Sequence, residues 1–187
     1  MTRCPWVPLG DKLYEEYHDN VWGVPEHDDQ KLFGKLILDG AQAGLSWRTI
    51  LGKTDAYHRV FDNFEIRKVA NYDEKKLGAL MNNPGIVRNR LKVESAVKNA
   101  RAVLAIQNEF GSFDKYLWGF VGGKTIVNRP AKLSDIATES DVSRAISKDM
   151  KSRGMNFVGP TIIYAYMQAI GMVDDHTTDC WRKKRVK

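Results

Sequence analysis

Cysteines are scarce in this sequence and long apolar runs are missing, and both shortages limit what the protein can be. Among its 187 residues are only two cysteines, Cys4 and Cys180, which lie near opposite ends. Two are too few for the dense disulfide framework of small secreted domains. No stretch reaches the roughly 18 apolar residues of a membrane-spanning helix, and the N-terminus lacks the apolar core of a signal peptide. We therefore expect a cytoplasmic protein.

Internal repeats and low-complexity linkers are also missing, so the sequence predicts one domain over residues 1–181. Hydrophobic residues make up 43% and charged residues 28%, an ordinary globular mixture that can form a core. The net charge is +6, which favours a polyanionic partner. Residues 182–187 carry five positive charges, and we interpret them as a basic, disordered C-terminal tail. We expect a monomer.

Apolar residues recur at helical spacing through most of the chain, which predicts an all-α fold. Polar residues that can cap a helix precede five of these segments: Asp28, Ser46, Asp73, Ser112 and Ser140. The longest predicted helix covers about 86–110, and the last runs from Pro160 to Gly171. Residues 122–127 combine two glycines with β-branched residues, and they predict a loop or short hairpin.

Cysteine and histidine occur as one pair near each end, Cys4 with His18 and His176 with Cys180. The two later residues have the spacing H-x3-C, which lets both side chains converge on one ion. A Cys2His2 set suits a structural zinc site, which four protein ligands close. Two other interpretations remain open from spacing alone: a disulfide between the cysteines, or buried free thiols beside core histidines.

The connection 151–161, between two predicted helices, could hold a phosphate. Gly159 permits close approach of the backbone, and Pro160 suits the first turn of a helix. The N–H groups of Gly159 and Thr161 would then lie at a positive helix end, where Arg153 or Lys151 could add charge. A plain turn between two core helices is the alternative.

Aromatic residues are dense in the first fifty positions, and a carboxylate, Asp39, follows an apolar helical segment nearby. Aromatic faces stack on a purine, and a carboxylate accepts hydrogen bonds from its exocyclic amine. An alkylated purine is cationic and gains additional cation–π attraction. The alternative is that the rings belong to the core and Asp39 ends a helix near solvent. The aromatic residues concerned are Trp6, Tyr14, Tyr17, Trp22 and Trp47.

Five ordered motifs closely resemble the bacterial 3-methyladenine DNA glycosylase I family over almost the whole chain. They are Cys4-x-Trp6, Tyr17-His18-Asp19-Asn20 through Trp22-Gly23-Val24-Pro25, Gln42-Ala43-Gly44-Leu45-Ser46-Trp47, Phe157-Val158-Gly159-Pro160-Thr161, and Asp175-His176 with Cys180. The resemblance implies a helix–hairpin–helix glycosylase fold, with the hairpin at about 151–161, and one structural zinc ion. It assigns the zinc ligands to Cys4, His18, His176 and Cys180.

The resemblance also implies roles at the base and on the DNA. Tyr17 and Trp47 would stack on an extruded base that Asp39 recognises, with Trp6, Tyr14 and Trp22 around it. The remaining implied residues contact double-stranded DNA, through an intruding turn and the hairpin: Gly44, Leu45, Val158, Gly159 and Thr161.

Two positions depart from the family pattern, which usually has Glu where this chain has Asp39 and Gln where it has Ala41. Aspartate is shorter by one methylene, which moves the carboxylate by about 1–1.5 Å. Such a shift can break a direct hydrogen bond or place a water in between. We place Asp175 beside the metal, as a partner that orients His176.

The implied activity is hydrolytic release of 3-methyladenine from alkylated DNA by a monofunctional glycosylase of base-excision repair. Two alternatives are a zinc-stapled DNA-binding module with impaired catalysis and a glycosylase for another alkylated base. The enzyme interpretations predict an open, ring-sized slot between Tyr17, Asp39 and Trp47. The binding-module interpretation predicts that this space is filled or collapsed.

Overall fold

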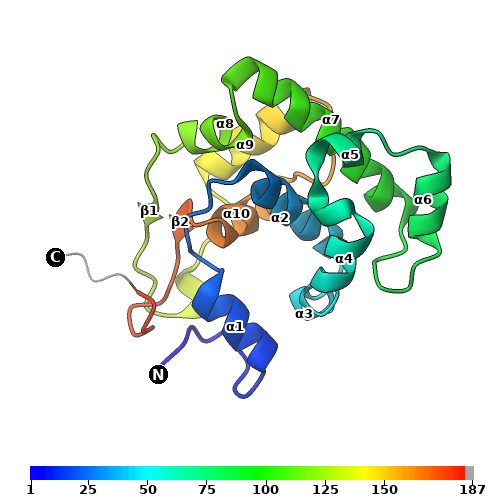
Figure 1. Cartoon of the computed structure of the whole chain (residues 1–187). Coiled ribbons are helices and arrows are strands. Elements are labelled where there is room, and N and C mark those ends of the chain that lie inside the picture. The colour runs from blue at the N-terminus through cyan, green and yellow to red at the C-terminus, as the bar shows by residue number, and fades with distance from the viewer. Residues whose placement is uncertain (184–187) are drawn as a thin grey trace.

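The computed structural model describes residues 1–183, and this part of the chain is mostly helical (Figure 1). None of its helices is both long enough and apolar enough to cross a membrane. The elements in chain order are α1 (Lys12–Asn20), α2 (Asp29–Gln42), α3 (Trp47–Leu51), α4 (Thr54–Val60), η1 (Asp62–Phe64), α5 (Ile66–Ala70), α6 (Glu74–Met81), α7 (Arg90–Phe110), α8 (Phe113–Gly119), β1 (Ile126–Val127), η2 (Leu133–Asp135), α9 (Asp141–Ser152), α10 (Pro160–Ala169) and β2 (Val173–Asp174).

The polar residues predicted to cap helices do so. Each accepts a hydrogen bond from the backbone N–H three residues later, which satisfies a donor that the first turn leaves free. The five caps are Asp28 of α2, Ser46 of α3, Asp73 of α6, Ser112 of α8 and Ser140 of α9. Local sequence therefore sets where these helices begin.

Two predicted boundaries differ from the structure. The longest helix, α7, begins at Arg90 instead of 86, because Asn89 caps it by accepting from the N–H of Lys92. Residues 122–127 form no hairpin of their own. Instead, β1 pairs in parallel with β2, with Ile126 opposite Val173. This two-residue pairing is the exception to the all-α prediction among residues 1–183.

Helices α2 and α10 lie side by side at the centre of the molecule (Figure 1). The hydroxyl of Tyr166 on α10 donates to the carbonyl oxygen of Leu32 on α2 at 2.9 Å, and both residues are fully buried. Along one side, α7, α8 and α9 cover this pair. The short elements α3 and η1 also contact α2, and α5 and α6 pack against α7. The centre is thus a rigid support for residues at the end of α2.

The two ends of the described chain lie together on the side of α1 (Figure 1). The N–H of Trp181 donates to the carbonyl oxygen of Thr2 at 2.9 Å. Within the segment interpreted as a basic tail, Lys183 donates to the carbonyl oxygen of Asn128 and lies 3.4 Å from a carboxylate oxygen of Asp174. Residues 184–187 of that segment lie outside the described residues.

Candidate functional site

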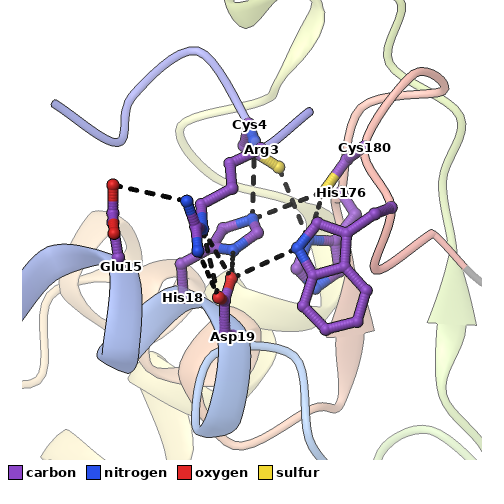
Figure 2. Close-up of polar contacts among 8 residues, drawn as sticks. Arg3, Cys4, Glu15, His18, Asp19, His176 and Cys180 are labelled. Atoms are coloured by element: carbon purple, nitrogen blue, oxygen red, sulfur yellow. Dashed lines mark hydrogen bonds and ion pairs between the residues drawn. The ribbon is translucent and has the colours of Figure 1, made fainter. Parts of the chain in front are cut away.

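Figure 2 shows Cys4, His18, His176 and Cys180 converging from both ends of the chain. Cys4 precedes α1, His18 lies in the last turn of α1, and the other two follow β2. All four are buried, and their potential ligand atoms lie within 4.8 Å of one another. The four residues singled out from the sequence are therefore together in the fold.

Distances within this Cys–His cluster suit one tetrahedral ion. The Sγ of Cys4 lies 3.4 Å from Nδ1 of His176, and the Sγ of Cys180 lies 3.4 Å from Nε2 of His18 and 3.6 Å from Nδ1 of His176. A tetrahedron with Zn–S of about 2.3 Å and Zn–N of about 2.0–2.1 Å has S–N edges of about 3.5 Å. Both cysteines are free thiols. The cluster could therefore hold a metal ion, as a closed four-ligand site.

Burial shapes the protonation of these four residues. It lowers the pKa of His176 to about 4 and also lowers the pKa of His18, so both rings are neutral near pH 7, the form that binds metals. Burial raises the pKa of the Cys4 thiol to about 12. A buried thiolate therefore needs a compensating cation, which a bound metal would supply.

Asp19 is the carboxylate that orients a histidine of the cluster. Its Oδ1 lies 2.8 Å from Nδ1 of His18, which leaves Nε2 facing the cysteines. The guanidinium of Arg3 donates to Asp19 at 2.7 and 2.9 Å (Figure 2), and this bonding holds the pKa of Asp19 well below its usual range. A carboxylate next to a histidine in the sequence was the available signal, and sequence analysis missed it.

The role expected for Asp175 is wrong. Its carboxylate accepts hydrogen bonds from Asn128, Tyr164 and Gln168 at 2.7–2.8 Å and makes no hydrogen bond to His176 among the described residues. The neighbouring Asp174 contacts His176 instead, by accepting from its backbone N–H at 3.1 Å. Asp175 therefore ties the segment after β2 to α10.

Aromatic rings from the first fifty residues lie directly against the Cys–His cluster. Trp22 is edge-on to His176, with ring centroids 4.6 Å apart, and Trp6 lies 5.0 Å from Trp22. Trp6 is also 6.1 Å from Tyr14 and 6.4 Å from Tyr17. Both Trp22 and Trp6 thus face the cluster, since the Trp6 ring also lies 5.4 Å from that of His18.

Asp39 comes together with Tyr17 and Trp47, but the space between them is filled. The Tyr17 and Trp47 centroids are 5.2 Å apart, and the rings are inclined by 50°. A stacked purine needs about 7 Å between two flanking rings, roughly twice the 3.5 Å contact distance of carbon atoms. The open slot that the enzyme interpretations predict is therefore not seen in this conformation.

Lys35, which sequence analysis missed, fills the space. Its Nζ lies 2.5 Å from Oδ1 of Asp39, 4.2 Å from the Trp47 ring centroid and 5.6 Å from that of Tyr17. Burial raises the pKa of Asp39 and lowers that of Lys35, and the ion pair between them opposes both shifts. The spacing of four residues on α2 was the only sequence signal for this pair.

One oxygen of this buried carboxylate is not used. Asp39 is 4% exposed, and among residues 1–183 its Oδ2 has no hydrogen-bond partner. The indole N–H groups of Trp6 and Trp47 are likewise buried without a partner in the described chain. Unpaired buried polar atoms are rare because each carries a desolvation cost. Two of these residues, Asp39 and Trp47, lie against the ammonium of Lys35.

The turn after α2 presents the next two predicted residues to solvent. Gly44 has a φ of +75°, which favours glycine, and Leu45 is 41% exposed. The ammonium of Lys92 on α7 donates to the carbonyl oxygens of Ala41 and Ala43 at 2.8 and 2.6 Å. It thereby caps the end of α2 and positions this turn.

The connection between α9 and α10 touches α2 one residue after Asp39. A Cβ added to Gly40 would lie 3.1 Å from Cβ of Phe157. Gly159 caps α10 and Thr161 is exposed, whereas the Val158 side chain is buried. Arg153, which could add charge here, has its guanidinium paired with Glu109 and Asp149. Lys151 is exposed and remains a candidate cation.

The structure so far is a mostly helical fold with a Cys–His cluster, a buried carboxylate and two aromatic rings, and known proteins share its sequence pattern. A family model described as methyladenine glycosylase matches residues 6–183. Curated relatives named DNA-3-methyladenine glycosylase, from Haemophilus influenzae, and DNA-3-methyladenine glycosylase 1, from Escherichia coli, are 47% and 44% identical over 180 residues. Each alignment covers 96% of both chains.

A solved structure gives the same result at the level of the fold. It is a Tyr-to-Phe variant of 3-methyladenine DNA glycosylase I in complex with 3-methyladenine, and it is 38% identical to this chain. The match covers 100% of both chains with a TM-score of 0.95. The fold and site thus define a helical DNA glycosylase. This chain belongs to the methyladenine glycosylase family.

Proposed function

We propose that this protein is a cytoplasmic DNA-3-methyladenine glycosylase that releases 3-methyladenine from double-stranded alkylated DNA. The observation that carries the proposal is the buried Asp39 carboxylate, which has an unpartnered oxygen and is paired with Lys35 beside the Tyr17 and Trp47 rings. The relatives that share the family support the same activity by their names. The solved relative that contains 3-methyladenine supports the ligand.

The reaction is hydrolysis of the bond between deoxyribose C1′ and purine N9. Methylation at N3 makes the base a cation, so it leaves as a neutral molecule once it takes the electron pair of that bond. Water adds its oxygen to C1′ and loses a proton to solvent. Flipping the base costs a few kcal/mol, and less for a poorly stacked lesion.

We assign base recognition to three residues. Tyr17 and Trp47 stack on the two faces of the base, and Asp39 accepts a hydrogen bond from its exocyclic amine through Oδ2. Trp6 and Tyr14 border this base pocket, whereas Trp22 supports it from the metal side. The carboxylate also attracts the positive charge of the alkylated base, which favours the lesion over normal adenine.

We assign DNA binding to two connections that meet near the pocket. Leu45, carried by the Gly44 turn, enters the duplex where the base has left. The helix–hairpin–helix unit of α9 and α10 grips the backbone with the N–H groups of Gly159 and Thr161, because a helix N-terminus attracts a phosphate. Contact between Phe157 and Gly40 links this grip to α2 and thus to Asp39.

We further propose that the ion at Cys4, His18, His176 and Cys180 is zinc and that its role is structural. Two thiolates and two imidazoles are a donor set typical of zinc, and four protein ligands leave no position for a substrate. When bound, the ion would supply a cross-link between the ends of the chain. The glycosylase domain would then comprise residues 1–181, with a basic tail after it.

Base release from methylated DNA tests the function directly. The protein is incubated with N-methylated duplex, and the freed bases are separated by chromatography, with an undamaged duplex of the same sequence as the control. We expect 3-methyladenine from the first duplex and no base from the second. Release of a different base would point to another alkylated substrate. Tight binding without any release would support the alternative of a DNA-binding module.

A further inference from the structure

Lys35 has contacts that are unusual for a lysine. Its side chain is only 12% exposed, although lysines are almost never buried unless they are paired. The pairing partner is Asp39, at 2.5 Å, and the ammonium also lies 4.2 Å from the centroid of the Trp47 ring. These are an ion pair and a cation–π contact made by a single group.

The same two contacts are those that a flipped base would need. A ring stacked on Trp47 lies about 3.5 Å above it, which is the space that the Lys35 ammonium takes. The cationic charge of the base would face the same indole, and its amine would face the same carboxylate. Lys35 and the base therefore exclude each other from this space.

We propose that Lys35 is a placeholder: its ammonium occupies the base pocket when no base is bound, and it withdraws when a flipped base enters. The inference rests on the proposed assignment of the pocket to Tyr17, Asp39 and Trp47. It makes Lys35 an internal competitor that weakens the binding of any base, the product included. The long, flexible stem of a lysine allows such withdrawal toward solvent.

When no base is bound, the Lys35 ammonium compensates the charge of the buried Asp39 carboxylate. A buried carboxylate among aromatic rings has a high desolvation cost unless a cation compensates it. Lys35 supplies that charge before the base arrives. After cleavage the released base is neutral, and its attraction to the Asp39 carboxylate is weaker than that of an ammonium. The return of Lys35 then favours product release.

The test measures the binding of free 3-methyladenine to three variants by titration calorimetry. Lys35→Met keeps an unbranched side chain and removes the charge, so we expect about ten-fold tighter binding once no ion pair and cation–π contact must be broken. Lys35→Arg keeps the charge and should not bind more tightly. Lys31→Met, which removes an exposed lysine one turn earlier on α2, should leave binding unchanged.

Parallel measurements on Trp47→Ala distinguish failure of this inference from failure of the pocket. If Trp47→Ala loses base binding while Lys35→Met binds no tighter than the unaltered protein, the pocket stands and the placeholder is overturned. If neither substitution changes base binding, the pocket lies elsewhere and both ideas are overturned. Absence of any base release by the unaltered protein would instead contradict the proposed function.

A measurement on the unaltered protein avoids any loss of folding in the variants. Acetylation of individual lysines is followed by mass spectrometry, with and without saturating 3-methyladenine. Withdrawal predicts that Lys35 reacts faster in the presence of the base, because its amine moves from the pocket to solvent, while Lys31 reacts at the same rate. Equal or slower acetylation of Lys35 with base bound would show that it does not leave, and would overturn the proposal.

Discussion

At the scale of single residues, the shorter acid at position 39 is the feature that most affects base recognition. Asp39 is buried, and Lys35 engages only one of its two oxygens. The unpartnered Oδ2 is thus an acceptor that the buried end of α2 holds in place. A hydrogen bond from the base to this oxygen would form in a site of low polarity, where charge-assisted bonds are strong.

Asp39→Asn should lower the excision of 3-methyladenine about 10–100-fold, because a hydrogen bond to a charged group contributes about 1.5–3 kcal/mol. Affinity for undamaged duplex should be almost unchanged, since the DNA contacts lie elsewhere. Single-turnover excision and duplex binding measure the two quantities. Asp55→Asn, at an exposed position on α4, is the matched control. Full activity in Asp39→Asn would remove this residue from the mechanism.

The Cys–His cluster could be predicted from the sequence, and Lys35 could not. Two cysteines and two histidines have few roles in which all four are buried together, so residue type and the family resemblance were sufficient. A lysine on an amphipathic helix normally faces solvent. That Lys35 turns inward depends on where α1 and α3 place Tyr17 and Trp47, which is tertiary information.

At the scale of the elements, the end of α2 connects the base pocket with the duplex. Helix C-termini leave carbonyl oxygens unpaired, and here Lys92 satisfies those of Ala41 and Ala43. Burial lowers the pKa of Lys92, yet its ammonium also faces the negative end of the α2 dipole, which favours the charged form. The cap fixes the turn that carries Leu45.

Lys92→Met should therefore destabilise the protein by about 1–3 kcal/mol, the usual cost of leaving buried carbonyl groups without a donor. Urea unfolding measures this loss. Lys98→Met, at an exposed position on the same helix, should change the unfolding free energy much less. Because the turn loosens, excision should also fall when assayed well below the melting temperature. A Lys92→Met variant as stable as its control would show that water caps α2 equally well.

Helix starts were predictable because the caps act locally, and strand pairing was not. A side chain that bonds an N–H three residues later leaves its signal within four positions of sequence. The partner of β1 is β2, more than forty residues away, and a two-residue strand carries no periodic pattern. The helices α4 and α5 have no capping side chain and were missed for a similar reason, whereas α1 was missed although Asp11 accepts from the N–H of Tyr14.

The turn that follows α10 tolerates only glycine. Gly171 has a φ of +74°, and a Cβ there would lie 2.4 Å from the backbone nitrogen of Pro25. We expect Gly171→Ala to destabilise the protein by about 2–4 kcal/mol, as at other strained backbone positions. Gly78→Ala, inside α6 with open space around its Cβ, should instead add about 0.5–1 kcal/mol. In thermal unfolding, the melting temperature of Gly171→Ala should be lower than that of the unaltered protein, and that of Gly78→Ala should be higher.

At the scale of the whole molecule, the Cys–His cluster joins the ends of the chain and supports the aromatic residues. Trp22 packs against His176, Trp6 packs against Trp22, and Tyr17 packs against Trp6. Tyr17 is also adjacent in sequence to His18, so a shift of the cluster moves a residue of the base pocket. The metal would then affect base binding through position, without contact with the base.

Removal of the metal should therefore destabilise the fold more than it alters the chemistry of the folded protein. The proposed cross-link would close a loop of roughly 160 residues and restrict the unfolded chain by about 4–5 kcal/mol in an ideal-chain estimate. The purified protein is unfolded in urea before and after treatment with a chelator, and its metal content is measured each time. The unfolding free energy should fall by at least this amount, because ligand bonds are lost as well. Cys180→Ser should reproduce the loss without a chelator. At low temperature, where the treated protein remains folded, 3-methyladenine release should continue. Complete loss of release in protein that is still folded would show that the ion acts in the reaction itself, and unchanged stability would show that it is not a cross-link.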